Sequence, residues 1–599
     1  MYLWASRFKE FCRDAVIPPA MWRVLSNASR AVHADKRKAD KNKSQYPYIW
    51  DGDDFELAHD LRYVAMPDAP VAMGITRARD TRAAIEVKRD VDIRVGPFPA
   101  DTVAFTTAVA QARINLPYAD LTVALDGTVV TQIKGPLIAE NWNNVRVPVG
   151  DPAKVSTLRL SWSGERLYLS QPVPERNLAE RDKRPNVIVL VLDSMVPETV
   201  GCLSGVSPEE SFTPQIDRYF ADGQLCTNAY SQSEYTMPSL ATMMTGLYPI
   251  QHGVFTHDRC QRTIPPQIPT LAEFLQDAGY RTFAYSTGRR YVPPYGHYRG
   301  FERFHFHNQS LTDTTDTVVS RAIEFIETHK DSPTFCFLHI IDPHPPFALP
   351  TYFSELNAGA SRWGDSRSLY GAFKLHRDSR ERVADLREME RVMVRNLDFI
   401  LGKLFGYLEY EGLDKTTDVM VLADHGREYM KGSPLLTRGL TRIPFLLAGP
   451  GVNAGVCDGF VEPPIDLYPT IAGMAGLEPP PHLSGRDALD PAGGCRTVGR
   501  SESLFRETGE IVLREDDRMY ALRFQLDDLA GEGDFDAPVG EWLFRRDPTT
   551  KEEDMSENLL ESEPETTARF REMVREHYED MERHFSNDSI IAVTRDYPK

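Results

Sequence analysis

Asn186-Val-Ile-Val-Leu-Val-Leu192 is a continuous apolar run that ends at Asp193. Such a run is typical of a central parallel strand, because helices cover both faces of a parallel sheet. Similar apolar runs follow at 281–285, 334–341, 418–423 and 444–448, and helix-like stretches lie among them at 214–222, 270–278, 317–328 and 381–410. This alternation predicts an α/β domain over 181–500, with a mainly parallel sheet flanked by helices.

The segments on either side of this domain have a different pattern. Leu121, Val123 and Leu125 alternate with other residues ahead of the hairpin-type dipeptide Asp126-Gly127. Alternation with a period of two predicts an N-terminal antiparallel β-sandwich over 51–180. Its role, sugar binding or packing, stays open. Short strands at 520–524 and 542–544 and a charged helix at 563–584 predict a small C-terminal α+β subdomain over 501–599.

Charge and cysteine usage limit the classes of partner and compartment. The net charge of −19 disfavours nucleic acid as a partner, so a phosphate-bearing substrate would need local positive charge or a metal cation. The seven cysteines are scattered and contain no C-x-x-C pair, which argues against a disulfide framework or a zinc cluster. No apolar run approaches the roughly 18 residues of a spanning helix. We therefore expect a cytoplasmic protein.

The first fifty residues form a basic, aromatic extension. They contain ten Lys or Arg and four Asp or Glu, with Trp4, Phe8, Phe11 and Trp22 among them. This composition suits peripheral contact with an anionic membrane or with a partner protein. The alternative is a helical extension that packs its aromatic side chains on the body of the protein.

Three residues at the ends of predicted strands could bind a metal ion. Asp193 follows the first strand, and Asp424 and His425 follow the run 419–423. Ligands of doubly wound sheets sit at the carboxyl ends of the strands, so these side chains are expected at one sheet edge. Carboxylate and imidazole ligands suit one divalent ion, and Mn²⁺, Mg²⁺, Ca²⁺ and Zn²⁺ all remain open.

A hydroxyl-bearing residue is predicted at the start of a helix. In Thr236-Met-Pro238-Ser-Leu-Ala-Thr-Met-Met-Thr-Gly246, Pro238 suits the first turn and Gly246 the position just past the last. Thr236 then lies at or beside the N-cap, where a threonine often only caps. The same place offers unpaired N–H groups and a positive dipole end, which favour an alkoxide nucleophile and phosphoryl oxygens.

Many short motifs in order resemble the sulfatase family of the alkaline phosphatase superfamily. They span about 185–560 and include Thr213-Pro-Gln-Ile-Asp217, Thr227-Asn-Ala-Tyr230, Thr245-Gly-Leu-Tyr-Pro-Ile-Gln-His-Gly253, Ala278-Gly-Tyr-Arg-Thr282, Leu338-His-Ile-Ile-Asp-Pro-His344, Ala423-Asp-His-Gly426, Arg442-Ile-Pro-Phe-Leu-Leu-Ala-Gly-Pro450, Asp466-Leu-Tyr-Pro-Thr470 and Leu543-Phe-Arg-Arg-Asp-Pro548. The resemblance implies an alkaline-phosphatase-like α/β fold and a metal-dependent enzyme of phosphate or sulfate esters.

The resemblance also implies roles for single residues. Asp193, Asp424 and His425 would bind the metal, and Thr236 would be the nucleophile and a further ligand. His344 would contact the transferred group or protonate the leaving oxygen, and Arg289 would hold an anionic substrate. His339 and His252 match positions of structural importance. Where sulfatases resemble one another in a Gly-Lys-Trp-His stretch, this chain has Gly288-Arg-Arg-Tyr291.

Two departures from the family pattern bear on the chemistry. Sulfatases that form formylglycine need Cys or Ser followed by x-Pro-x-Arg, whereas this chain has Thr236-Met-Pro238-Ser-Leu240. A threonine cannot become formylglycine, and a threonine sulfate would lack the exit that formylglycine provides. A threonine phosphate can be released by in-line attack at phosphorus. The first strand ends in Asp193-Ser194 instead of Asp-Asp, which is more similar to phosphoglycerol-type transferases.

The sequence therefore favours a phosphate-ester hydrolase or phospho-group transferase that forms a covalent intermediate on Thr236. A glycan or a lipid headgroup is the expected acceptor or leaving group. The first alternative is a sulfatase that works without formylglycine. The second is a catalytically silent relative that binds a glycan, although retention of Asp193, Thr236, Asp424 and His425 speaks against a decayed site.

Overall fold

The computed structural model describes residues 55–56, 64–65, 73–77, 80–87, 92–98, 102–110, 120–133, 142–162, 166–175, 184–254, 263–288, 291, 293–306, 315–345, 347, 380–428, 436–491, 493–505, 508–525 and 538–586. The basic extension 1–50 and Arg289 lie outside these residues, so the predictions made for them stay predictions. Among the described helices, none combines the length and the apolar character needed to span a bilayer.

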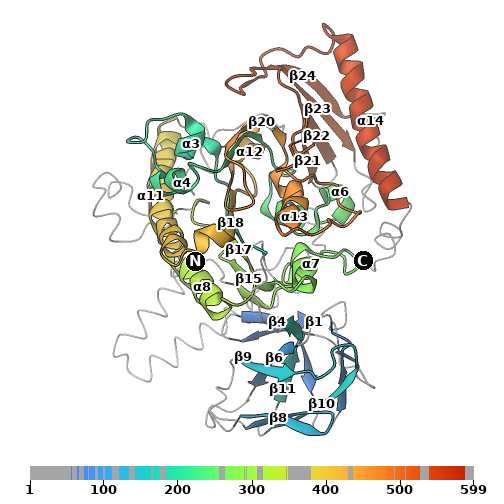
Figure 1. Ribbon diagram of the computed structural model, residues 1–599. Coiled ribbons are helices and arrows are strands. Elements are labelled where there is room, and N and C mark those ends of the chain that lie inside the picture. The colour runs from blue at the N-terminus through green and yellow to red at the C-terminus, as the bar shows by residue number, and fades with distance from the viewer. Residues whose placement is uncertain are drawn as a thin grey trace, which may run out of the picture. The chain divides into compact units, whose positions relative to one another are not determined.

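The N-terminal strands form two antiparallel layers (Figure 1). One layer contains β1 (Phe55–Glu56), β3 (Met73–Arg77), β4 (Asp80–Val87), β6 (Thr102–Ala110), β9 (Trp142–Pro148), β11 (Arg166–Ser170) and β12 (Val173–Glu175). The other contains β2 (Val64–Ala65), β5 (Asp92–Val95), β10 (Ser156–Trp162), β7 (Leu121–Leu125) and β8 (Thr128–Ile133). Leu121, Val123 and Leu125 point into the shared core, as their spacing predicts.

The predicted turn between β7 and β8 is present. Asp126 and Gly127 have φ values of 46° and 80°. Positive φ at both central residues is the requirement of a two-residue type I′ turn, which explains the Asp-Gly pair.

The strand order of the central sheet is β16-β15-β17-β13-β18-β19-β14-β20, and β16 also pairs antiparallel with β4, so the sheet continues into one N-terminal layer. Its strands are β13 (Asn186–Leu192), β14 (Gln224–Ala229), β15 (Arg281–Ser286), β16 (Arg303–Phe306), β17 (Thr334–Ile340), β18 (Thr417–Leu422), β19 (Phe445–Ala448) and β20 (Gly455–Val461). Pairing is parallel from β16 to β18, and β19 runs antiparallel to both neighbours. Every residue of β13 is buried, which explains its continuous apolar sequence.

Helices cover both faces of this sheet. Figure 1 shows α11 (Arg380–Tyr410), α8 (Thr315–Thr328) and α4 (Pro214–Tyr219) on one side, and α6 (Pro249–His252), α7 (Leu271–Asp277) and α13 (Pro463–Met474) on the other. Helix α5 (Thr236–Thr245) packs against α13 and α6. Shorter elements are α3 (Gly201–Ser204), α12 (Arg438–Thr441), η1 (Pro197–Thr199), η2 (Pro293–Tyr295) and η4 (Leu413–Thr416). The α/β architecture predicted from strand and helix alternation is confirmed.

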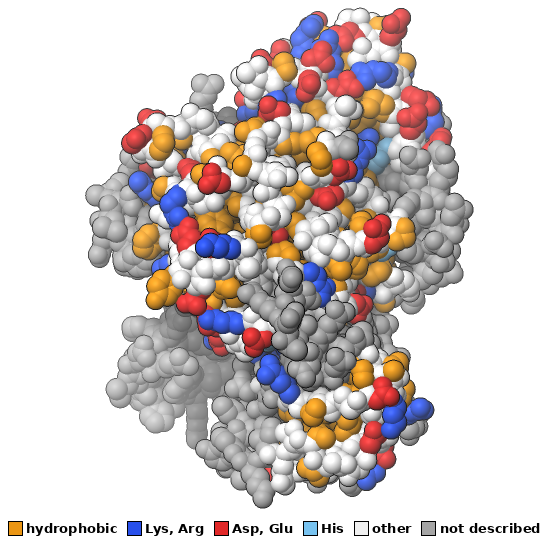
Figure 2. All heavy atoms as spheres, viewed as in Figure 1, with side chains coloured by type: hydrophobic (Ala, Val, Ile, Leu, Met, Phe, Trp, Pro, Cys, Tyr) orange, Lys and Arg blue, Asp and Glu red, His pale blue; other side chains and the backbone are white. Residues whose placement is uncertain are grey.

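The C-terminal part is a separate antiparallel sheet with one long helix. Its strands are β21 (Gly499–Phe505), β22 (Thr508–Arg514), β23 (Arg518–Gln525), β24 (Gly540–Arg546) and β25 (Glu553–Asp554), paired in that order. Helix α14 (Pro564–Ser586) packs on it, and Phe570 stacks on Tyr520 at 5.3 Å between ring centroids. Figure 2 shows acidic and basic side chains interspersed on the described part of one face, so the negative net charge forms no single acidic patch there.

Candidate active site

The predicted metal ligands meet at the carboxyl edge of the central sheet. Asp193 follows β13, and Asp424 and His425 lie just beyond β18. These strands are direct parallel neighbours, so their carboxyl ends lie side by side. One ligand atom from each of the three residues lies within 4.8 Å of the other two. Residues that are about 230 positions apart in sequence thus form one cluster.

Each carboxylate has one oxygen suited to a cation. Asp424 Oδ1 accepts hydrogen bonds from the N–H groups of Ser194 (2.8 Å) and His425 (2.9 Å). Asp424 Oδ2 and Asp193 Oδ1 are buried and have no hydrogen-bond partner within the described structure. Two buried carboxylates that face one another need a cation nearby to offset their desolvation. The donor set therefore fits a divalent metal ion.

The ring of His425 is held with Nε2 toward the carboxylates. Its Nδ1 donates to the carbonyl of Gly426 at 2.7 Å, which leaves the Nε2 lone pair for a metal ion. Nε2 lies 3.5 Å from Asp424 Oδ2. Burial alone would lower the pKa of His425, but the carboxylates of Asp424 and Asp193 outweigh burial and raise it.

Asp193 is stabilised in its ionised form. Burial would raise its pKa, but the nearby imidazoles of His344, His339 and His425 lower it to about 2. His339 Nε2 lies 3.3 Å from Asp193 Oδ2, and its Nδ1 lies 3.3 Å from Ser286 Oγ. We expected His339 to be structural, and the structure places its ring beside Asp193.

Thr236 is the first residue of α5. The N-cap is Tyr235, which makes no side-chain capping hydrogen bond, and the helix ends at Gly246 with φ 65°. Thr236 Oγ1 lies 3.3 Å from His425 Nε2, so the hydroxyl faces the cluster of predicted ligands instead of capping the helix. The positive end of the helix dipole lies at the same point.

Two serines dock α5 onto the loop that carries Asp424 and His425. Ser231 Oγ and Ser239 Oγ each donate to the carbonyl of Asp424 at 2.6 Å. Both serines are fully buried. No sequence pattern singles them out, because a serine near a helix start is common and its partner lies about 190 residues away.

His344 follows β17 and lies near the cluster. Its Nδ1 is 2.5 Å from the carbonyl of Pro345. Burial lowers the pKa of His344, and the positive charge of Arg427 adds to this effect, whereas Asp193 opposes it. His252 lies elsewhere: its Nε2 is 3.0 Å from Thr242 Oγ1, and its Nδ1 accepts from the N–H of Val254. Both ring nitrogens of His252 are therefore used within the core.

Arg427 was missed from sequence, although it directly follows the Ala-Asp-His-Gly motif. Its guanidinium donates to the carbonyls of Pro343 (2.8 Å) and Ser194 (2.7 Å) and lies 3.2 Å from Glu390 Oε1. It thereby ties together the loops after β13, β17 and β18. Ser194 itself has φ 54°, and its buried Oγ has no hydrogen-bond partner in the described part of the chain.

Tyr291 stands at the position of the histidine in the Gly-Lys-Trp-His stretch that sulfatases share. Its side chain is fully buried, and its hydroxyl donates to Met244 Sδ on α5 at 3.6 Å. The tyrosine therefore packs under α5 and is not a member of the cluster of Asp193, Asp424 and His425.

Comparisons with known proteins agree with this geometry. The Sulfatase family model matches residues 185–477. The extracellular sulfatase SULF-1 homolog of Drosophila melanogaster is 23% identical over 55% of this chain and 33% of its own length. The Δ4,5-hexuronate-2-O-sulfatase of Bacteroides thetaiotaomicron is 21% identical over 51% of this chain and 71% of its own length. The chain spans about a third to just over half of the first curated relatives it matches.

Solved structures share the fold. The protein yidJ from Bacteroides fragilis has a TM-score of 0.53 at 18% identity, covering 69% of this chain and 99% of its own. The phosphonate monoester hydrolase of Silicibacter pomeroyi has a TM-score of 0.52 at 17% identity, covering 67% and 97%. Residues 185–477, just under half of the chain, therefore match the sulfatase family, and the solved structures share the fold.

Proposed function

We propose that this chain hydrolyses or transfers a phosphate ester through a covalent intermediate on Thr236, with one divalent metal ion. The observation that carries the proposal is the 3.3 Å approach of Thr236 Oγ1 to His425 Nε2. It places a hydroxyl beside two buried carboxylates and an imidazole, at a helix N-terminus that favours anionic oxygens.

The metal ligands in this proposal are Asp193, Asp424, His425 and the hydroxyl of Thr236. A divalent ion bound there would act as a Lewis acid, stabilising the deprotonated hydroxyl and the charge on the ester oxygens. Several divalent metals suit this site, because mixed oxygen and nitrogen ligands accept more than one ion.

The reaction has two displacements at phosphorus. In the first, Thr236 Oγ1 forms a bond to phosphorus, the bond to the leaving oxygen breaks, and His344 gives that oxygen a proton. The hydroxyl proton of Thr236 passes to solvent. In the second, water or an acceptor alcohol attacks phosphorus and gives its proton to His344, the bond from phosphorus to Thr236 Oγ1 breaks, and that oxygen takes a proton from solvent. Arg427 holds the loops that carry these groups in register.

Phosphorus is preferred over sulfur because of the side chain at position 236. A threonine cannot become formylglycine, so a sulfated Thr236 would have to be released by attack at sulfur. The fold likeness to a phosphonate monoester hydrolase is compatible with phosphorus chemistry. The second candidate, sulfate-ester hydrolysis, is favoured by the names of the curated relatives, which include N-acetylgalactosamine-6-sulfatase of Rattus norvegicus.

A glycan or lipid headgroup is the proposed carrier of the ester. One structural neighbour, Ps i-CgsB, was solved in complex with k-i-k-neocarrahexaose, which supports a glycan. Peripheral membrane contact through the basic extension 1–50 and a cytoplasmic location remain predictions from composition.

The test compares ester classes on one protein. The full chain, loaded in turn with Mn²⁺, Mg²⁺, Ca²⁺ and Zn²⁺, is assayed with nitrophenyl phosphate, bis-nitrophenyl phosphate and nitrophenyl sulfate. We expect phosphorus esters to turn over faster, and Thr236→Ala to lose on the order of 10⁴-fold or more in kcat. Thr236→Ser should keep measurable turnover. Thr245→Val removes a hydroxyl that bonds within the same helix and is the matched control.

Intact mass after substrate exposure tests the intermediate. A phosphoryl group on Thr236 supports the proposal, and faster turnover of the sulfate ester contradicts the preference for phosphorus. Metal binding without turnover of any ester, and without a mass increase in the presence of substrate, would contradict the catalytic proposal as a whole.

A further inference from the structure

Three cysteines that are far apart in sequence meet at the edge of the central sheet. Cys226 on β14 and Cys457 on β20 are direct register partners in a parallel pair. Cys495 precedes Arg496, whose backbone exchanges hydrogen bonds with Phe460 of β20 at 2.7 and 3.1 Å. The thiols of Cys226 and Cys495 both lie close enough to Cys457 to lower its pKa. Cys457 is therefore the centre of the group.

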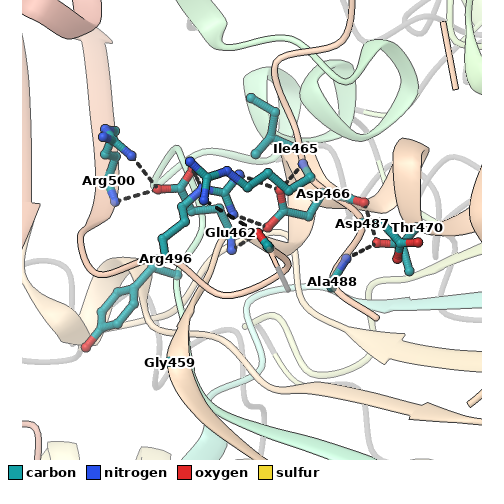
Figure 3. Close-up of polar contacts among 12 residues, drawn as sticks. Gly459, Glu462, Ile465, Asp466, Thr470, Asp487, Ala488, Arg496 and Arg500 are labelled. Carbon is teal, nitrogen blue, oxygen red and sulfur yellow. Dashed lines mark hydrogen bonds and ion pairs between the residues drawn. The ribbon is translucent and has the colours of Figure 1, made fainter. Parts of the chain in front are cut away.

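Gly459 makes room for Cys495. A Cβ built on Gly459 would lie 2.6 Å from Cys495 Cβ and 3.2 Å from Cys495 Sγ, closer than a real side chain allows. Cys457 Sγ lies 3.9 Å from the carbonyl of the same glycine. Figure 3 shows Gly459 on the ribbon next to Arg496. The missing side chain lets Cys495 reach β20 near Cys457.

The three thiols differ in access to solvent. Cys226 is buried, Cys457 is half-buried and Cys495 is exposed. Hydrogen bonds from the neighbouring thiols lower the pKa of Cys457, although burial opposes this effect. The pKa of Cys202 behaves differently, since burial and the nearby Asp217 raise it to about 12. Cys457 thus combines a lowered pKa with partial access to solvent, two features of reactive cysteines.

The register of β14 and β20 disfavours a covalent bond between Cys457 and Cys226. In-register residues of parallel strands hold their Cβ atoms about 4.8 Å apart, whereas a disulfide prefers roughly 3.5–4.5 Å. Cys226 is also fixed within the sheet, while Cys495 lies outside the strands. A metal site is less suitable: among the described residues, only Asp193, Asp424 and His425 form a group with all ligand atoms within 4.8 Å of one another.

We propose that Cys457 is a peroxide-reactive thiol that forms a reversible disulfide with Cys495. The Cys457 thiolate attacks one oxygen of hydrogen peroxide, the O–O bond breaks, and sulfenic acid and hydroxide form; the hydroxide takes a proton to become water. The Cys495 sulfur then attacks the sulfenic sulfur. The S–S bond forms, the S–O bond breaks, and the hydroxyl leaves with the Cys495 proton as a second water.

This bond would lie beside a buried ionic network that holds α13. Arg496 donates to both carboxylate oxygens of Asp466 at 2.5 and 2.6 Å and lies 3.4 Å from Glu462 Oε2 (Figure 3). Helix α13 in turn packs against α5, which carries Thr236. The disulfide would join the edge strand β20 to the segment that supplies Arg496, so we expect oxidation to raise the thermal midpoint.

The test treats the full chain with hydrogen peroxide and maps its peptides by mass. We expect a cross-link between the peptides of Cys457 and Cys495, a loss of two hydrogens, and reversal by dithiothreitol. In Cys495→Ser, Cys457 should remain as a sulfenic acid that a dimedone-type reagent traps. In Cys226→Ala, oxidation of Cys457 at pH 7 should slow roughly tenfold, because less thiolate is present.

Two variants act as controls. Cys202→Ala should form the same cross-link between Cys457 and Cys495 as the parent protein, because Cys202 takes no part in the proposed reaction. Gly459→Ala keeps all three cysteines but displaces Cys495, so the cross-link should decrease while Cys457 is still oxidised. A dominant cross-link of Cys457 to Cys226 or to Cys12, or peroxide treatment that leaves Cys457 unmodified, would overturn the proposal.

Discussion

In the cluster of Asp193, Asp424 and His425, hydrogen bonds to one atom of a side chain determine which other atom faces the candidate metal position. Asp424 uses Oδ1 for two backbone N–H groups, and His425 uses Nδ1 for the carbonyl of Gly426. Oδ2 and Nε2 are thereby turned to the same space. Such hydrogen bonds orient the ligands before any ion binds and contribute strongly to metal affinity.

His344 gives a prediction that separates two possible roles. If it protonates the leaving oxygen, His344→Asn should lower kcat for an alkyl phosphate about 10²- to 10⁴-fold. The same variant should affect a nitrophenyl phosphate little, because nitrophenolate leaves without a proton. The measurement is the ratio of kcat for the two esters. An equal loss for both would instead show that His344 only binds the transferred group.

The residues that sequence reasoning could find are those whose neighbours along the chain carry a signal. Asp193, Asp424 and His425 follow apolar strands, and Thr236 precedes a helix with proline and glycine at its ends. The structure brings all four together. Ser239 and His339 could not be assigned to the site, because their partners are set by tertiary packing. Arg427 also acts through backbone carbonyls, which leave no trace in a sequence.

At the scale of elements, loops after three strands depend on one guanidinium. Arg427→Lys should weaken metal binding roughly 10- to 100-fold, because an ammonium cannot serve two carbonyls in the planar geometry of arginine. Calorimetric titration with the metal measures this effect. Arg299→Lys is the matched control, since Arg299 binds the carbonyls of Pro265 and Ile268 away from the ligands. Equal losses in both variants would indicate general destabilisation only.

The predicted elements agree with the structure where the pattern is long or bounded. The run at 186–192 is β13, and the long stretch at 381–410 is α11, which begins at Arg380. Helix α7 begins after Thr270, whose hydroxyl accepts from the N–H of Glu273. Strand β20 was not predicted, because its sequence Gly-Val-Cys-Asp-Gly-Phe-Val has glycines, an acid and no regular alternation. Its place at the sheet edge comes from pairing with β14, a non-local interaction.

At the scale of the whole molecule, non-local pairing also explains why the cluster of Cys226, Cys457 and Cys495 was not predicted. The sequence spacing of the cysteines argued against a disulfide framework. However, Cys226, Cys457 and Cys495 come together only through the pairing of β14 with β20 and the return of the chain at Arg496. Spacing rules detect local motifs and are blind to clusters that topology assembles.

The pH dependence of stability is also a property of the whole molecule, because two sets of buried groups change the unfolding free energy in opposite directions. Burial lowers the pKa of His252 and His297 to about 3, so the unfolded chain takes up their protons first below about 6.5. The stability they contribute is present above this pH and is lost as pH falls toward 3. Burial raises the pKa of Glu234 and Glu502 to about 7. The folded chain takes up these protons first, so their contribution grows as pH falls from 7 to about 4.5.

The two sets have opposite effects on the unfolding free energy of the parent protein, so we compare each variant with the parent. His297→Phe removes a buried ring whose nitrogens have no hydrogen-bond partner in the described structure. Relative to the parent protein, it should gain about 1 kcal/mol in unfolding free energy between pH 7 and pH 5.5. Glu502→Gln should lose about 1–2 kcal/mol over the same interval, since the parent alone is stabilised by protonation. Urea unfolding of the three proteins at both pH values measures these changes, and parallel pH profiles would show that neither group titrates as its burial requires.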